Sequence, residues 1–360
     1  MPVNPGHTDQ PADPRPGEAP DAAKLAAFLE GRLADFSGLL EIRQYPGGYS
    51  NHTFLLTWKN GSCILRKPPP GADIRSAHDM SREFRVLTAL RPHYACMPMP
   101  LLFSDDLTVM GTRFFLMERV SGTILRGSMP GGMHPGPTLM RGISEAAVDG
   151  LARLHRIDIA GGGLEVLGKP EGYVQRQVEG WIGRYEKAET DDIPDMRLTA
   201  EWMRAHLPPE TEPAMIHNDY KYDNLVLDPA DMTRILAVLD WEMATVGDPL
   251  MDLGTTLAYW CEANDSPSLR PFNLTWLPGN LSRAEVVERY AAERGMAVPD
   301  MLFYYVFGSY KIGVIVQQIY ARYRKGIAKD PRFAGLIHVL KACAENARRA
   351  ISVGRISDLY

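Results

Sequence analysis

The first patterned segment of the chain carries apolar residues at helical spacing over 22–36, which predicts a short amphipathic helix. The period then changes, because residues 40–67 form two extended apolar runs separated by Asn60–Gly61. That dipeptide between apolar runs is typical of a tight hairpin turn. A helix at 79–90 and strands at 99–105 and 112–120 complete the region. The N-terminal part is therefore predicted to be a small antiparallel sheet with one helix beside it.

Helical patterns dominate the remainder of the chain. They cover 143–156, 173–188, 196–207, 284–295, 301–325 and 333–352. The block around 215–240 differs, because short apolar runs there are broken by polar loops. Together these patterns predict an α+β fold, with a small antiparallel β lobe followed by a larger, mainly α lobe.

Composition argues against a nucleic-acid or membrane partner. The net charge is −5, the sequence pI is about 6.0, and no basic tract is longer than two or three residues, whereas such partners select clustered Lys and Arg. The cysteines, Cys63, Cys96, Cys261 and Cys343, form no CxxC pair. This spacing argues against a structural zinc site or a disulfide framework, and a reduced cytoplasmic setting fits best.

Two segments could be mistaken for targeting or membrane elements. Residues 1–22 are rich in Pro, Asp and Gly and lack an apolar stretch, so a disordered tail is predicted rather than a secretory signal. Residues 301–320 are apolar but include Lys311, Gln317 and Gln318. A charge near the middle of a span is costly in lipid, so this segment is predicted to be a buried helix.

The candidate chemistry lies in residues 216–240. His217-x-Asp219 is followed by Asn224, and Asp240 comes sixteen residues after Asn224 at the end of an apolar run. Phosphoryl transfer needs a carboxylate to orient a hydroxyl and oxygen ligands to hold Mg²⁺ on the phosphates. Asn224 and Asp240 are oxygen donors of the kind that magnesium prefers. His217 is interpreted as a structural support of this loop.

The motif resembles a known superfamily. HNDYKYDN at 217–224 is similar to the catalytic loop of protein kinases, while Trp241 and GDPLMDLG at 247–254 resemble the aminoglycoside phosphotransferase and choline kinase branch. Further segments are similar to the kinase-like domain fused to some acyl-CoA dehydrogenases. They are GGYSNHTFLL (47–56), ILRKPPPG (64–71), REFRVLTAL (82–90), LARLHRID (151–158) and VFGSYKIGVIVQQIYARYRKG (306–326). This resemblance, over roughly 25–350, implies a bilobal protein-kinase-like fold.

Carried over position by position, the resemblance assigns roles in the catalytic loop. It implies that Asp219 is the catalytic base and that Lys221 contacts the transferred phosphate. Asn224 and Asp240 are implied to be the magnesium ligands. The implied cofactors are therefore ATP and Mg²⁺.

The resemblance also assigns the nucleotide side. Arg66 takes the place of the kinase lysine that holds the α- and β-phosphates, and Glu83 is implied to pair with it. Gly47, Gly48, Ser50 and Asn51 would form the loop covering the phosphates, and Glu118 to Val120 the hinge that reads adenine. The implied domains are a nucleotide-binding lobe at 23–118 and a catalytic and acceptor-binding lobe at 119–360.

Departures from the kinase pattern leave one choice open. Neighbours in a strand point to opposite faces, so only one of Arg66 and Lys67 can face the phosphates. Arg66 is favoured because a guanidinium forms a bidentate fork for phosphate. The loop near Gly47 also lacks a full GxGxxG, and an Asp-Phe-Gly triplet is absent from the sequence.

Other polar residues have plainer interpretations. Asp248 and Asp252 fit a turn and the start of a helix, where Asp is a favoured N-cap, and Glu242 is a weaker metal candidate. In 301–325, Tyr304, Lys311, Gln318 and Arg322 fall near one face. That stripe could recognise the acceptor or form an internal hydrogen-bonded network. Gln177, Trp181 and Arg184 raise the same question, with the internal network favoured.

The sequence therefore predicts an ATP- and Mg²⁺-dependent phosphotransferase acting on a hydroxyl of a small molecule. Lys311 and Arg322 favour an anionic acceptor, and the resemblance points to a hydroxyacyl-CoA or hydroxy acid. An aminoglycoside or other amino-alcohol or sugar kinase is one alternative, and a catalytically silent nucleotide-binding module is another. A metal-dependent hydrolase is a third, which would use His217, Asp219 and Asp240 as ligands. The oligomeric state stays open.

Overall fold

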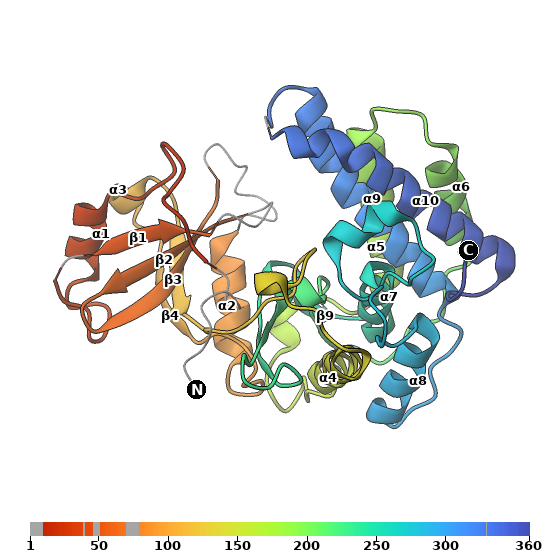
Figure 1. Ribbon diagram of the computed structural model, residues 1–360, viewed down its shortest axis with the longest axis horizontal. Coiled ribbons are helices and arrows are strands. Elements are labelled where there is room, and N and C mark those ends of the chain that lie inside the picture. Colours follow the sequence, from red (N-terminus) through yellow and green to blue (C-terminus); the bar gives the residue numbers. More distant parts are fainter. Residues whose placement is uncertain (1–9, 39, 46–50, 70–78, 329) are drawn as a thin grey trace. The chain divides into compact units, whose positions relative to one another are not determined.

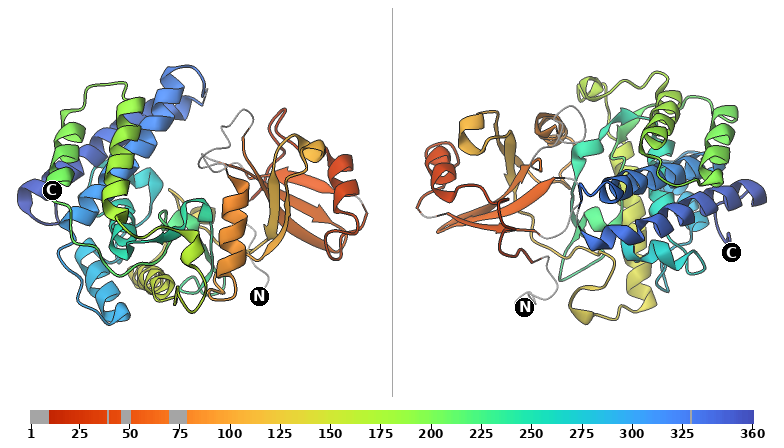
Figure 2. Two further views of the ribbon diagram at one scale, coloured as in Figure 1. Left: turned by 180° about the vertical axis from the view of Figure 1, so that it is seen from behind. Right: turned by 90° about the horizontal axis from the view of Figure 1, so that it is seen from above.

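The computed structural model describes residues 10–38, 40–45, 51–69, 79–328 and 330–360. The chain divides into two compact units (Figures 1 and 2). Unit 1 comprises Met1–Ile124, Val226–Asp231 and Ile235–Ala244, and unit 2 comprises Leu125–Leu225, Met232–Arg234 and Thr245–Tyr360.

Unit 1 is built on a five-stranded antiparallel sheet with strand order β1-β2-β3-β5-β4. The strands are β1 (Glu41–Gln44), β2 (His52–Trp58), β3 (Gly61–Lys67), β4 (Pro100–Ser104) and β5 (Phe114–Glu118). The predicted hairpin is confirmed, since β2 and β3 pair in register from His52 opposite Lys67 to Trp58 opposite Gly61. The two turn residues are Lys59 and Asn60, one position before the predicted Asn60–Gly61, because Gly61 already pairs with Trp58 as the first residue of β3.

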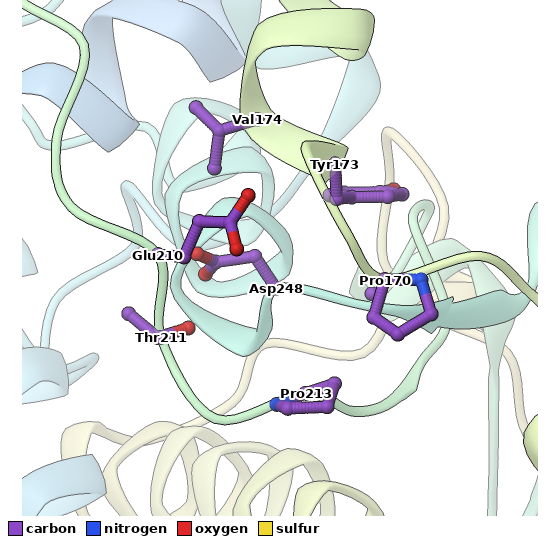
Figure 3. Close-up of a pocket in the computed structure, with 8 residues that line it drawn as sticks. Pro170, Tyr173, Val174, Glu210, Thr211, Pro213 and Asp248 are labelled. Carbon is purple, nitrogen blue, oxygen red and sulfur yellow. The ribbon is translucent and has the colours of Figure 1, made fainter.

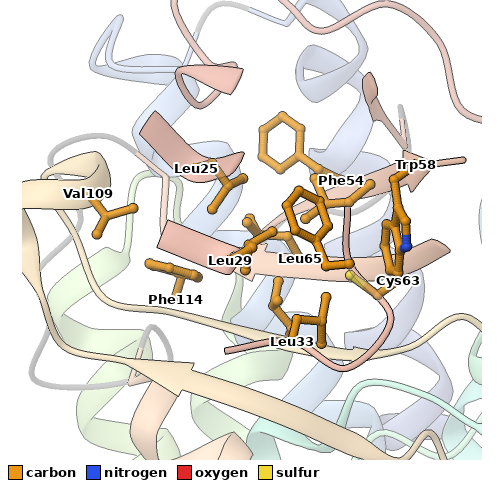
Figure 4. Packing of buried hydrophobic residues seen from close by; sticks show 12 residues of the cluster. Leu25, Leu29, Leu33, Phe54, Trp58, Cys63, Leu65, Val109 and Phe114 are labelled. Atoms are coloured by element: carbon orange, nitrogen blue, oxygen red, sulfur yellow. The ribbon is translucent and has the colours of Figure 1, made fainter. Parts of the chain in front are cut away.

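Strand alternation gives the sheet of unit 1 two different faces. One face packs its apolar residues against α1 (Ala22–Leu29) and α3 (Leu107–Met110), with Leu25, Phe54, Leu65 and Phe114 in the cluster (Figure 4). On the other face Phe115 contacts Phe84 of α2 (Met80–Leu90), with ring centroids 6.0 Å apart. Arg66 shares this second face and reaches Glu83 of the same helix.

The N-terminal segments of unit 1 differ in part from the sequence prediction. The helix predicted over 22–36 ends at Leu29, because Gly31 adopts a left-handed φ of 71° that cannot continue a helix. Of the predicted tail 1–22, residues 1–9 lie outside the described residues. Ala12 exchanges two backbone hydrogen bonds of 2.8 Å with Gln44 at the sheet edge.

Unit 2 is mainly helical. Its helices are α4 (Pro137–His155), α5 (Tyr173–Ala188), α6 (Pro194–Ala205), α7 (Pro249–Tyr259), α8 (Arg283–Arg294), α9 (Leu302–Arg324) and α10 (Leu336–Val353). The predicted ranges match six of these helices within a few residues at most boundaries, whereas only the start of α7 was predicted. Helix α4 begins earlier than predicted, at Pro137, because Pro is favoured in the first helical turn. Two short strands, β6 (Ala214–Ile216) and β9 (Thr245–Gly247), pair antiparallel beside the helices.

Helix α9 is the centre of unit 2 and packs against both α7 and α10 (Figure 1). Two glycines allow the close approach of α7 and α9. A Cβ added at Gly254 would lie 2.3 Å from the Tyr304 carbonyl oxygen, and one at Gly308 would lie 2.3 Å from the Gly254 carbonyl oxygen. The predicted burial of the 301–320 segment is confirmed, since most of α9 is buried. Among the helices of the described ranges, none has both the length and the apolar character needed to cross a bilayer.

Candidate active site

The loop after β6 in unit 2 brings together the sequence-predicted residues 219, 221 and 224. A short 3-10 helix, Tyr222–Asn224, folds the chain back so that Asn224 Nδ2 donates to the Asp219 carbonyl at 2.8 Å and to Asp219 Oδ2 at 2.9 Å. Lys221 Nζ lies 3.2 Å from Asp219 Oδ1 and 3.0 Å from Oδ2. The Asp219 side chain keeps 15% of its surface exposed, so a ligand can still reach its carboxylate.

Tyr259, at the end of α7, is a further member of this cluster. It hydrogen-bonds Asp219, and its ring lies 4.6 Å from Lys221 Nζ. Burial alone would raise the pKa of Asp219, but Lys221, Tyr259 and His217 outweigh it and hold that pKa below its usual range. Asp219 is therefore ionised at neutral pH. The sequence carried no signal for Tyr259, because it ends an otherwise apolar helical stretch.

A buried hydrogen-bond network centred on Asp252 holds the backbone of the same loop. Asp252 on α7 is fully buried and accepts from the backbone N–H groups of His217 and Asn218, both at 2.7 Å. It also contacts His155 Nε2 at 3.1 Å, and His155 Nδ1 lies 2.7 Å from Tyr290 Oη. Since a carboxylate only accepts, His155 donates through Nε2. Despite burial, His155 and His217 lower the pKa of Asp252.

The structural interpretation of Asp248 and His217 agrees with the geometry. Asp248 caps α7 by accepting from the N–H groups of Leu250 and Met251 at 2.7 and 3.2 Å. His217 is fully buried, and its Nδ1 accepts from the Asp219 N–H at 3.2 Å. His217 therefore supports the loop, and Asp248 supports the start of α7.

A small cavity in unit 2 lies beside this network. Its lining comprises Pro170, Tyr173, Val174, Glu210, Thr211, Pro213, Gly247 and Asp248, and Figure 3 shows two carboxyl groups among these residues, those of Glu210 and Asp248. The empty space is about 210 Å³ with open solvent included, below the roughly 300 Å³ of typical ligand pockets. The cavity is therefore too small to hold a large acceptor.

In unit 1, Arg66 is the centre of a cluster of carboxylates. Its Nε lies 3.4 Å from Glu83 Oε2, and its Nη2 lies 2.9 Å from Asp240 Oδ1 and 3.3 Å from Glu242 Oε2. Burial disfavours the charged guanidinium, but these carboxylates raise the pKa of Arg66 overall. Burial raises the pKa of Glu83 to about 7, outweighing its attraction to Arg66. Asp240 has a left-handed φ of 67°, a costly conformation often found at functional sites.

Two residues hold this cluster in place. Asn51 Nδ2 donates to Glu242 Oε2 at 2.7 Å. Arg82, next to Glu83 on α2, donates to the carbonyls of Glu242 and Ala244. Sequence reasoning did not single out Arg82, because a cation on an amphipathic helix is by default a solvated charge.

The remaining predicted nucleotide-side residues have mixed positions. Lys67 points to the opposite face from Arg66 and lies 5.5 Å from the Phe54 ring. The Glu118 backbone N–H donates to the Met99 carbonyl at 2.8 Å, and Glu118 Oε2 accepts from the Met99 N–H at 3.1 Å. Val120 follows the end of β5 and is half-buried. Gly47, Gly48 and Ser50 lie outside the described residues.

The candidate acceptor stripe on α9 does not form one exposed surface. Tyr304 and Lys311 are buried, Gln318 is half-buried and Arg322 is exposed. On α5, Trp181 Nε1 donates to Gln177 at 3.2 Å, and the Arg184 guanidinium lies 4.5 Å from the Trp181 ring. These contacts favour an internal hydrogen-bonded role for most of these residues. Arg184 and Arg322 remain exposed to solvent.

The two predicted magnesium ligands, Asn224 in unit 2 and Asp240 in unit 1, each keep an oxygen donor available. Asn224 uses Nδ2 toward Asp219, so its Oδ1 remains as an oxygen donor, and the Asp240 side chain keeps 30% of its surface exposed. Within the described ranges, no group of three or more His, Cys, Asp or Glu side chains is arranged to hold a metal ion. Amide and carboxylate oxygens suit magnesium, which keeps several water ligands.

An antiparallel five-stranded sheet, a mainly helical unit and an Asp-Lys-Asn loop define a kinase-like phosphotransferase fold. Residues 41–297 match the model of the phosphotransferase enzyme family, and the chain belongs to that family. The predicted α+β, protein-kinase-like fold and the resemblance to the aminoglycoside phosphotransferase branch are thereby confirmed.

Individual relatives refine this assignment. The chain is 35% identical over 352 residues to acyl-CoA dehydrogenase family member 11 of Gallus gallus, covering 96% of this chain and 45% of that protein. It thus spans less than half the length of that relative. A protein provisionally assigned as an aminoglycoside phosphotransferase from Ralstonia eutropha superposes with a TM-score of 0.76 at 29% identity, covering 92% of this chain and 99% of that one. The GDP and kanamycin complex of APH(2")-IIia shares the fold alone, with a TM-score of 0.61 at 14% identity over 89% of this chain and 98% of that one.

Proposed function

We propose that this protein transfers the γ-phosphoryl group of ATP to a hydroxyl group of a small molecule, with Mg²⁺ as cofactor. The observation that carries the proposal is the convergence of Lys221 and Asn224 on the Asp219 carboxylate. Membership of the phosphotransferase enzyme family supports the reaction class.

Asp219 would orient the acceptor hydroxyl and accept its proton. As the new bond from the acceptor oxygen to phosphorus forms, the bond from that phosphorus to the ADP oxygen breaks. The low pKa of Asp219 makes it a weak base, so its main role is alignment of the hydroxyl, with the proton leaving late in the reaction. Lys221 would stabilise the negative charge on the transferred group.

Asn224 and Asp240 would hold Mg²⁺, which when bound neutralises charge on the phosphates. Arg66 would bind the α- and β-phosphates, oriented by Glu83, and Gly47, Gly48, Ser50 and Asn51 would form the loop that covers the phosphates. Glu118 to Val120 would contact adenine. The GDP complex of the fold neighbour supports a nucleotide as the donor. On this proposal, 23–118 binds nucleotide and 119–360 carries catalysis and acceptor recognition, in a cytoplasmic setting that suits four free cysteines.

The acceptor we favour is a hydroxyacyl-CoA or a related hydroxy acid. Similarity to acyl-CoA dehydrogenase family member 11 supports this choice. The exposed cations Arg184 and Arg322 also suit an anionic ligand better than a polycationic aminoglycoside. Phosphorylation would convert the hydroxyl of such an acceptor into a leaving group.

An acceptor panel tests this proposal. Hydroxyacyl-CoA esters, free hydroxy acids, sugars and aminoglycosides are each incubated with enzyme, ATP and Mg²⁺, and ADP release is measured together with the mass of the product. Acceptor-dependent ADP release with a product 80 Da heavier is expected for the hydroxyacyl group.

Asp219→Ala is the companion variant. It should lower kcat by about 10³-fold, within the usual range for a proton-transfer group, while ATP affinity from calorimetry changes little. Full turnover by Asp219→Ala would exclude this residue as the base. ATP binding without turnover of any acceptor would instead favour a silent nucleotide-binding module.

A further inference from the structure

Lys311 is a buried cation that the proposed reaction does not use. It lies in the middle of α9 with 1% of its surface exposed. Its Nζ donates to the Asn218 carbonyl at 2.7 Å and lies 3.4 Å from Asn218 Oδ1. No carboxylate of the described residues lies within ion-pair distance of it. Burial of an ammonium with only neutral hydrogen-bond partners is costly, so its position calls for a specific structural reason.

The partner of Lys311 is the residue immediately before the proposed base. Asn218 has a left-handed φ of 67°, which costs energy for a residue with a side chain. Three helices hold its polar groups: its N–H donates to Asp252 on α7 at 2.7 Å, its Nδ2 donates to Tyr173 Oη on α5 at 3.1 Å, and its carbonyl accepts from Lys311 on α9. Both polar groups of the peptide that joins Asn218 to Asp219 are held, because Lys311 donates to its carbonyl and its N–H donates to His217 Nδ1.

The charges around Lys311 come from each neighbouring element. Burial is the largest influence and lowers the pKa of Lys311 to about 8. Asp252 on α7 and Asp219 in the loop act in the opposite direction, while Arg184 on α5 and Lys221 add to the lowering. On α5 the Trp181 ring also faces Nζ, at 5.7 Å. Lys311 is thus cationic at neutral pH and loses its charge in mildly alkaline solution.

We infer that Lys311 is a positioning residue, which fixes the carbonyl of the 218–219 peptide and thereby the direction of the Asp219 side chain. The inference rests on the proposed function, because Asp219 is the base only in that reaction. The predicted polar stripe on α9 could either contact the acceptor or form an internal network. At Lys311 the ammonium is buried and donates to the 216–221 loop. Lys311 therefore supports the acceptor site without contacting the acceptor.

The kinetic test compares Lys311→Met with Lys311→Arg, using Lys325→Met as the matched control. Lys325 is an exposed lysine at the end of the same helix. Lys311→Met should lower kcat by about 100-fold, the scale of a misplaced catalytic group, with KM for both substrates within about threefold. Lys311→Arg should recover most of kcat, and Lys325→Met should match the parent. A rise in acceptor KM at unchanged kcat would overturn the inference and make Lys311 an acceptor contact.

The pH profile adds a readout that a purely structural residue would not move. The parent enzyme should lose kcat as pH rises through about 8, whereas Lys311→Arg should keep its activity to higher pH. Identical alkaline limbs for the two proteins would count against the inference.

Hydrogen exchange separates this inference from the proposed reaction. Overlapping peptides covering 216–221 should exchange faster in Lys311→Met than in the parent and in Lys325→Met, under conditions where circular dichroism shows all three folded. If no acceptor is phosphorylated by the parent, the proposed function fails, and exchange still decides whether Lys311 holds the loop. Unchanged exchange in this segment would overturn the role of Lys311. If Lys311→Met does not fold, Lys311→Gln replaces it, with an intermediate increase in exchange expected.

Discussion

The two units solve the problem of a buried carboxylate in opposite ways. In unit 1, one guanidinium, Arg66, is shared by Glu83, Asp240 and Glu242. In unit 2, one carboxylate, Asp219, is surrounded by donors from Lys221, Asn224 and Tyr259. The first cluster has an excess of negative charge and suits the addition of a cation, whereas the second is already balanced. The charge of the Arg66 cluster should therefore depend on pH and ligands near neutrality, and the charge of the Asp219 carboxylate should not.

The largest expected effect comes from removing the central carboxylate of unit 2. Asp252→Asn turns an acceptor for two backbone N–H groups and His155 into a group that can donate toward them. Breaking a fully buried network of this kind costs about 3–5 kcal/mol. Urea unfolding should show that loss, while Asp105→Asn, a matched change at an exposed site, should stay within about 0.5 kcal/mol. Equal stability of the two variants would show that the network is not needed.

A smaller effect is expected from changing the cation of unit 1. Arg66→Lys keeps the charge but loses the planar fork that reaches three carboxylates. The KM for ATP should rise about 10-fold, equivalent to about 1.4 kcal/mol. Lys67→Met tests the alternative, because Lys67 faces the other side of the sheet and should change this KM much less. A larger effect of Lys67→Met on this KM would show that Lys67, and not Arg66, contacts the phosphates.

The smallest effect concerns the pH dependence of stability. Glu83 has a folded-state pKa of about 7, above that of a carboxyl in the unfolded chain. The folded protein therefore holds this proton more tightly, and the resulting stabilisation is complete below the unfolded pKa and disappears as pH rises through about 7. Glu83→Gln should remove this slope between pH 5 and 8 in unfolding titrations. Glu288→Gln, an exposed control, should retain it, and a slope unchanged in Glu83→Gln would contradict the assignment.

The sequence predicted those features that depend on local spacing. The hairpin of β2 and β3 (with its turn one residue earlier than predicted), the helices of unit 2 and the Asp219-to-Asn224 loop all follow from patterns within short windows. Strand alternation likewise placed Arg66 and Lys67 on opposite faces. The roles of these residues in catalysis remain predictions.

Features that depend on long-range packing could not be predicted in this way. Lys311 and Asn218 are 93 residues apart, and Arg82 and the Glu242 carbonyl 160 residues apart. From the sequence alone, Lys311 and Arg82 could each equally be a polar side chain on the solvent-facing side of a helix. Only the packing of α9 against α7, and of α2 within unit 1, shows which backbone carbonyls Lys311 and Arg82 donate to.

The burial of α9 has a practical consequence for choosing expression boundaries. The family match ends at residue 297, five positions before α9 begins. A fragment that ends there would lack α9, which packs closely against α7 at Gly254. The buried apolar residues of α7 would then be exposed to solvent. Such a fragment should aggregate. A protein expressed without aggregation must therefore extend through α10, which packs against α9 as well.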